Sequence, residues 1–139
     1  WAALVGARTV HGGAALVVTA GTATTADVLS ADGLFCGGVI LPGLDLMRRS
    51  LARDTARLPL ADGHFEATPR RTVDAIFTGC LHAQAGAVER MFRLVADGPD
   101  AICLLNGGAA GALAPLLGCP LRQVDNLVLE GLARLAQDN

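Results

Sequence analysis

Short apolar runs separated by glycine turns make up the first third of the chain. Residues 15–19 are almost wholly apolar and have the length of a buried strand, and residues 24–29 carry enough β-branched side chains for a second one. Residues 34–41 predict a third strand, with a bulge or a close backbone approach at Gly37 and Gly38. Because tight turns join these runs, we expect an antiparallel three-stranded meander.

Helical periodicity follows the third strand. Pro42 is expected to open a helix, as a proline in the first turn should, and residues 59–71 are expected to form a loop. The apolar stripe of this helix comprises Leu44, Met47, Leu51 and Thr55. Thr72 is expected to cap a long second helix that ends near Ala96. Gly79, Ala83 and Gly86 leave a smooth strip on it, suited to close packing in the core or across a dimer interface.

The last third of the chain alternates strands and helices. Strands are expected at residues 101–105 and 121–124, and helices at residues 109–117 and from an Asp125 cap to Ala136. Trp1 to Arg8 has the pattern of the end of another helix. Three antiparallel strands followed by this alternation predict an α/β domain with a mixed sheet, and the length predicts that residues 1–139 form a single domain.

Composition narrows the possible functions. All 11 basic residues are arginine, so a Walker-type phosphate loop and Schiff-base chemistry are excluded. The net charge of −2 and the lack of a basic patch argue against a nucleic-acid partner. No apolar run reaches the ~18 residues of a membrane span. The cysteines are scattered, which predicts buried free thiols in a reducing compartment: Cys36, Cys80, Cys103 and Cys119.

Residues 21–25, Gly-Thr-Ala-Thr-Thr, form the first candidate for chemistry. The backbone N–H groups of a hairpin turn and the threonine hydroxyls could together hold phosphate oxygens. The alternative is a purely structural hairpin, in which glycine supplies the turn and threonine suits a strand.

Asn106-Gly107-Gly108 is the second candidate, because glycines between a buried strand and a helix let a nucleotide approach the backbone. The match to a dinucleotide fingerprint is poor, and Asp125 suits a helix cap better than a ribose-binding acid. Three arginines of the segment after Pro42 could serve a phosphate, although a solvated helix face explains them more simply: Arg48, Arg53 and Arg57.

Taken together, these stretches resemble a known family. The runs GTATTADV, GGVILPG, TARLP and NGGAA, in this order, are similar to the second half of type III pantothenate kinases. These belong to the actin-like superfamily of acetate and sugar kinases, which is built from ribonuclease H-like domains. The resemblance implies that the chain is the C-terminal half of a two-domain kinase, with the N-terminal domain and the catalytic aspartate lying before Trp1.

The resemblance further implies the reaction and the site. The family phosphorylates pantothenate with ATP in the first step of coenzyme A synthesis, as a cytoplasmic homodimer that needs Mg²⁺ and a monovalent cation, K⁺ or NH4⁺. By position, Gly21 and Thr22 match the residues at the ATP phosphates, and Gly107 and Gly108 match the turn beside the nucleoside. Thr72 matches the threonine that reaches pantothenate at the dimer interface.

One position departs from the family pattern. Where the family carries the aspartate that binds the monovalent cation, this chain has Thr19. A hydroxyl can coordinate potassium but brings no charge. A catalytically inactive homologue that acts as an interaction or regulatory protein, and a nucleotide-binding sensor, therefore remain alternatives to an active kinase.

Overall fold

A five-stranded mixed sheet forms the centre of the molecule in the computed structural model, which describes residues 1–60 and 62–138. The strands are β1 (Ala15–Ala20), β2 (Ala23–Leu29), β3 (Phe35–Pro42), β4 (Ile102–Asn106) and β5 (Leu121–Gln123), in the order β3-β2-β1-β4-β5. The first three strands pair antiparallel, whereas β4 lies parallel to both β1 and β5. The expected meander and mixed sheet are therefore confirmed.

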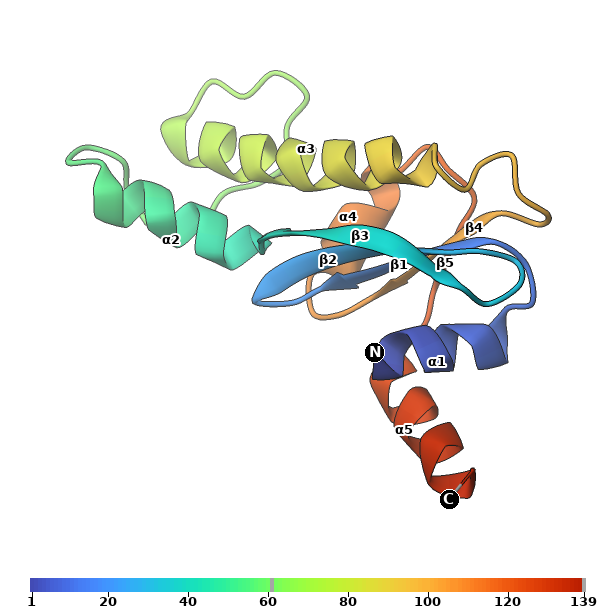
Figure 1. The fold of residues 1–139 in the computed structure, drawn as a ribbon. Helices are drawn as coiled ribbons and strands as arrows, with labels where there is room; N and C mark the ends of the chain where they lie inside the picture. Colours follow the sequence, from blue (N-terminus) through green and yellow to red (C-terminus); the bar gives the residue numbers. More distant parts are fainter. Residues whose placement is uncertain (61, 139) are drawn as a thin grey trace.

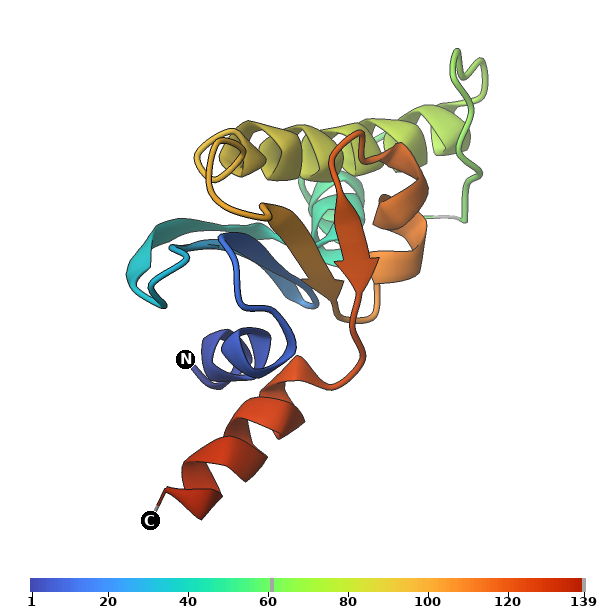
Figure 2. The same ribbon diagram turned by 90° about the vertical axis from the view of Figure 1, so that its right-hand side faces the viewer.

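Helices cover both faces of the sheet (Figures 1 and 2). One face carries α3 (Thr72–Phe92) and α4 (Ala110–Leu113), with α2 (Leu44–Asp54) beside them at the end of β3. The other face carries α1 (Ala2–Val10) and α5 (Leu127–Gln137), and the two ends of the chain lie on this side. A short 3-10 turn, Ala114–Leu116, follows α4 and contains Pro115.

Strand β1 is buried on both faces, which explains why its sequence is almost wholly apolar. Leu16 and Val18 contribute to the larger core under α3, and Ala15 and Val17 contribute to the smaller core under α1. All four cysteines are free thiols, as expected. The expectation that all are buried holds for Cys80 and Cys103. It is wrong for Cys36, which is exposed on the edge strand β3, and Cys119 is only half-buried.

The bulge expected at Gly37 and Gly38 is present. Asp27 pairs with Gly38 and Leu29 pairs with Phe35, so one residue of β2 opposes two residues of β3 between these pairs. The bulge lies on the outermost strand, where it interrupts an edge that would otherwise be open to pairing.

Three expected helix starts are wrong. Pro42 is the last residue of β3, because the strand continues pairing up to Ala23 opposite Pro42, and Gly43 is the N-cap of α2. Arg71 precedes α3, so Thr72 is its first residue and makes no capping hydrogen bond. Asn126, in a left-handed conformation, and not Asp125, precedes α5.

The end of the long helix also differs from the expectation. α3 stops at Phe92, and the chain then continues in tight turns, in which the N–H of Leu94 donates to Met91 and that of Val95 to Phe92. None of the helices in residues 1–60 and 62–138 is both long enough and apolar enough to span a bilayer.

Candidate phosphate site

The two glycine-containing turns meet at one edge of the sheet. β1 and β4 run parallel, with Val18 opposite Leu105 and Thr19 opposite Asn106, so the residues that follow each strand emerge side by side. The N–H of Ala109 donates to the carbonyl of Ala20 over 3.0 Å, which ties the second turn to the first. The sequence-predicted pairing of these loops is therefore present in the fold.

Gly107 makes this close approach possible. Its φ is +102°, in the region that favours glycine, and a Cβ at this position would lie 2.5 Å from the Ala20 carbonyl oxygen. A larger residue would push the two turns apart.

Gly21, Thr22 and Gly108 line a single cavity of about 520 Å³. The wall is completed by Ala20 at the end of β1, by Ala109 before α4, and by residues of α2, α3 and α4: Leu44, Asp45, Leu46, Arg48, Arg49, Phe77 and Ala112. Backbone N–H groups of the glycine turns, a threonine hydroxyl and guanidinium groups can all donate hydrogen bonds, so the cavity suits an anion with several oxygen atoms.

The first turn of α2 lies against the hairpin through Gly43. The N–H of Gly43 donates to the Thr22 carbonyl over 2.9 Å, and a Cβ on Gly43 would collide with the backbone of Gly21 and Thr22. The amino end of this 11-residue helix, with its partial positive charge, thereby forms part of the cavity wall. Sequence reasoning missed this role of Gly43, although Pro-Gly directly after a strand was a usable signal.

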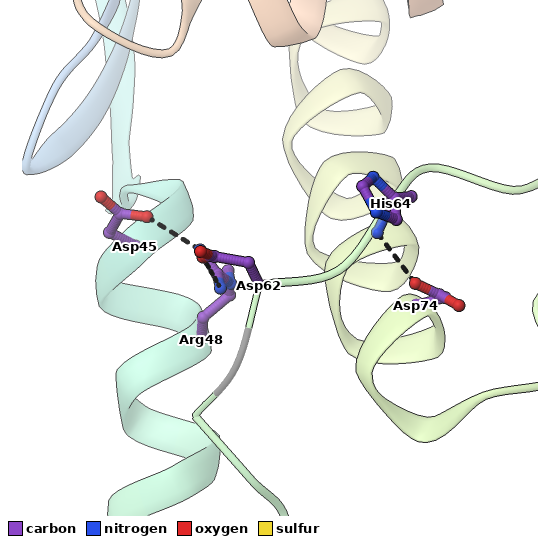
Figure 3. Close-up of polar contacts among 5 residues, drawn as sticks. All are labelled: Asp45, Arg48, Asp62, His64 and Asp74. Carbon is purple, nitrogen blue, oxygen red and sulfur yellow. Dashed lines mark hydrogen bonds and ion pairs between the residues drawn. The ribbon is translucent and has the colours of Figure 1, made fainter.

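Arg48 was expected on a solvated helix face, and this is wrong. Its side chain is only 12% exposed, lines the cavity and lies over the ring of Phe77, with 5.6 Å from the guanidinium carbon to the ring centroid. Its guanidinium contacts the carboxylates of Asp45 at 3.3 Å and Asp62 at 3.2 Å (Figure 3). Arg53 is 71% exposed and pairs with its neighbour Asp54, as a solvated position should.

The loop that carries Asp62 is fastened to α3 further along. The N–H of His64 donates to the buried carboxylate of Asp74 over 2.9 Å (Figure 3), and the N–H of Glu66 donates to the hydroxyl of Thr78 over 3.1 Å. Sequence reasoning did not identify these anchors, because an acid and a threonine in a helix are usually solvated.

Thr19 lies at the end of β1, half-buried, and is not among the residues that line the cavity. Its hydroxyl accepts a hydrogen bond of 3.1 Å from the amide of Asn106, which also donates to the Val18 carbonyl over 2.8 Å. A neutral oxygen that already accepts an amide N–H does not match the anionic ligand of a monovalent cation site. The role of Asn106 was not anticipated.

Gly107 lines a separate hollow of about 510 Å³, together with Asn106, Asp125 and Asn126. The two glycines of one turn therefore belong to two neighbouring hollows, Gly108 to the first and Gly107 to the second. Asp125 does not cap a helix, and it lines the second hollow together with Gly107.

Thr72 lies elsewhere, in an apolar groove of about 570 Å³ between α2 and α3. The groove also contains Gly79 and Ala83 of the smooth strip, while Phe77 of the same helix faces the cavity. The structure therefore does not bring Thr72 together with Thr22.

The clearest pKa shifts lie away from the cavity. Burial raises the pKa of the Asp27 carboxyl, and the amino group of Trp1 opposes this shift. Burial also raises the pKa of the Cys103 thiol to about 12, with smaller contributions from the neighbouring Cys119. Burial likewise raises the pKa of the Cys119 thiol, so neither thiol is ionised at neutral pH.

Comparison with known proteins adds independent information. Residues 1–94 match the family model of type III pantothenate kinase. The chain is 61% identical over 139 residues to the type III pantothenate kinase of Aromatoleum aromaticum, covering 100% of this chain and 57% of that protein. It is 60% identical to the type III pantothenate kinase of Azoarcus sp., covering 98% of this chain and 52% of that protein. The chain thus spans about half the length of these relatives.

Solved structures agree on the fold. A 2-dehydro-3-deoxygalactonokinase protein of Sinorhizobium meliloti superposes with a TM-score of 0.67 at 19% identity, over 99% of this chain and 58% of that one. A conserved protein of Campylobacter jejuni, described as a Baf family transcriptional activator, gives 0.66 at 24% identity, over 97% and 62%. These likenesses support the actin-like, ribonuclease H-like α/β fold expected from the sequence.

Proposed function

Because this chain belongs to the type III pantothenate kinase family, we propose that it is the C-terminal half of a two-domain kinase that phosphorylates pantothenate with ATP. The product is 4′-phosphopantothenate, and the reaction is the first step of coenzyme A synthesis in the cytoplasm. The observation that carries the proposal is the convergence of Gly21, Thr22 and Gly108 on one cavity with arginines in its wall.

In this proposal the hairpin holds the transferring phosphate. The backbone N–H groups after Gly21 and the hydroxyl of Thr22 donate to phosphate oxygens, and the amino end of α2 adds a fixed partial positive charge. Phosphoryl transfer depends mainly on such positioning and electrostatic stabilisation, since the protein need not form covalent bonds. The base that takes the proton of the pantothenate hydroxyl belongs to the preceding half of the protein.

The nucleoside would lie in the neighbouring hollow, where Gly107 and Asp125 face the same space. An aspartate there can accept hydrogen bonds from ribose hydroxyls. Of the described residues that line the phosphate cavity, only Asp45 has a carboxylate. One of its oxygens, Oδ1, contacts Arg48, so Oδ2 is the atom of this half that suits Mg²⁺. The K⁺ or NH4⁺ requirement has weaker support, because Thr19 brings no charge and is engaged by Asn106.

Pantothenate and a second copy of the chain are assigned to the groove between α2 and α3. Thr72 opens this groove, and the exposed Gly79 and Ala83 allow a helix of the partner to approach closely. A homodimer that closes the groove would convert its apolar wall into a substrate pocket.

The full-length protein tests this function directly. We expect ATP- and pantothenate-dependent release of ADP, with kcat/KM for ATP about tenfold lower in Thr22→Ala, because one hydrogen bond to a charged phosphate is lost. Thr68→Ala, on the exposed loop before α3, is the matched control and should be unchanged. Absence of pantothenate-dependent turnover in the wild-type protein would contradict the proposal.

A second candidate is an inactive homologue that binds nucleotide without transferring phosphate. The neutral Thr19 at the position of the family's cation-binding acid favours it. This candidate predicts that the same full-length protein binds ATP but releases no ADP.

A further inference from the structure

A largely buried arginine side chain is held at the wall of the phosphate cavity by two carboxylates that are themselves exposed. Arg48 has a side-chain exposure of 12%, whereas the side chain of Asp45 is 73% exposed and that of Asp62 is fully exposed, at 102%. In Figure 3 the carboxylate of Asp62 comes from the loop and that of Asp45 from the same helix as Arg48. The guanidinium of Arg48 is thus held in place, while the carboxylates of Asp45 and Asp62 remain exposed to solvent.

We infer that Arg48 binds a phosphate group of the nucleotide, and that Asp62 holds the guanidinium in position until phosphate replaces it. The inference rests on the proposed function, since it assigns a residue to the phosphate cavity. It goes beyond the hairpin and the glycine turn, because neither contains a full positive charge.

The chemistry favours such an exchange. A guanidinium presents the same fork of N–H donors to a carboxylate and to a phosphate, so Asp62 occupies the geometry that a phosphate would take. Phosphate carries more negative charge than a single carboxylate, and the cavity adds donors from the hairpin and the amino end of α2. Because the Asp62 carboxylate is fully exposed, water can solvate it after release, and the phosphate takes its place on the largely buried guanidinium.

The position of Arg48 is fixed independently of Asp62. The guanidinium lies over the ring of Phe77 on α3, and the contact with Asp45 lies within α2. Loss of Asp62 would therefore leave Arg48 at the cavity wall. Arg49 is the other arginine among the described cavity residues, and it is exposed.

The loop also remains anchored when Asp62 leaves. The backbone of His64 is bonded to Asp74, and that of Glu66 to Thr78, both on α3. Displacement of Asp62 by phosphate would therefore be a local change, confined to the part of the loop that precedes His64.

The test measures binding of ATP, pyrophosphate and adenosine to the full-length protein by calorimetry. We expect Arg48→Gln to weaken binding of ATP and pyrophosphate about tenfold to a hundredfold, since a charge-assisted contact is lost. Adenosine binding should not change. Asp62→Asn removes the competing carboxylate and should tighten pyrophosphate binding about twofold to fivefold.

Arg53→Gln and Asp54→Asn are matched controls, because this neighbouring pair is an ion pair of the same type that does not line the cavity. Both should leave all three affinities unchanged. If Arg48→Gln does not fold, Arg48→Lys and Asp62→Asn provide the test. The lysine keeps the charge without the fork and should cause a smaller loss of pyrophosphate binding.

The outcomes separate the two proposals. Wild-type protein that binds neither ATP nor pyrophosphate would overturn the proposed function and this inference together. Normal ATP binding in the wild type with equal pyrophosphate affinity in the Arg48 variants would overturn the inference alone. Loss of adenosine binding in parallel with pyrophosphate would assign Arg48 a purely structural role, and an unchanged affinity in Asp62→Asn would refute the exchange.

Discussion

At the residue scale, single polar side chains on the strands determine the local hydrogen bonding and electrostatics of the sheet. Asn106 bridges β4 to β1 by donating to both the Val18 carbonyl and the Thr19 hydroxyl. Asp27 lies on β2 opposite Val17, on the sheet face that α1 covers, and burial raises its pKa. Both positions carry a polar group in a mostly apolar sheet. A substitution of similar size at either position therefore changes the local electrostatics with little change in side-chain volume.

Asp27→Asn should stabilise the chain at neutral pH. A raised carboxyl pKa means that the folded state holds the proton more tightly than the unfolded state. The free energy of unfolding therefore falls as pH rises from the ordinary value of 3.8 through the pKa of the folded state. Asparagine carries no charge at any pH. The gain in free energy of unfolding, measured with urea, should be largest near pH 7 and vanish towards the ordinary aspartate value of 3.8. Asp32→Asn in the exposed turn is the control, and a pH-independent difference would contradict the prediction.

Thr19→Asp should create a strong potassium site in the full-length enzyme. A carboxylate near a monovalent cation adds an attraction of roughly 1–4 kcal/mol, which corresponds to about one to three orders of magnitude in cation affinity. The Asn106 amide, 3.1 Å from the Thr19 hydroxyl, can donate to the new carboxylate and orient it. Titration of potassium against initial rate compares the two proteins. Coinciding curves would mean that Thr19 does not occupy the cation position.

Element boundaries show which parts of the structure can be predicted from the sequence. The strands and helices follow from apolar periodicity, and the meeting of the two glycine turns follows from the parallel ends of β1 and β4. The start of α2 was missed because proline usually favours a first helical turn, whereas here Pro42 ends β3 and Gly43 caps the helix, its N–H donating to the hairpin carbonyl of Thr22. The burial of Arg48 likewise depends on a contact between two helices, since its guanidinium lies over the ring of Phe77 on α3.

Gly79→Leu should disrupt the proposed dimer through α3. A Cβ at Gly79 has no atom of the described chain within 4 Å, so the substitution fits the monomer and removes a glycine from a helix interior. The added bulk would instead block a second α3 from approaching the smooth strip. Sedimentation should show a shift from dimer to monomer, whereas Gly111→Leu, at an exposed helical glycine with equal space, should not. A wild-type monomer, or an unaffected dimer, would contradict this assignment.

The whole molecule has two different faces. Helices cover both faces of the sheet, but on the side where both ends of the chain lie (Figure 1) α5 also exposes a row of apolar side chains: Val128, Leu129, Leu132 and Leu135. Trp1 is 80% exposed on the same side. The chain also spans only 57% of its relative from Aromatoleum aromaticum. An apolar surface of this kind suits burial against further protein.

The 139-residue chain alone should therefore have no pantothenate kinase activity. The proposed catalytic base and half of the ATP site lie outside it, and general base catalysis contributes about 10²–10⁴-fold by itself. A coupled assay with ATP and pantothenate should give no turnover by the purified chain, while the full-length protein is active under the same conditions. Circular dichroism of the chain serves as the control for folding. ATP- and pantothenate-dependent turnover by the chain alone would show that all catalytic groups lie within residues 1–139, and would refute the two-half architecture.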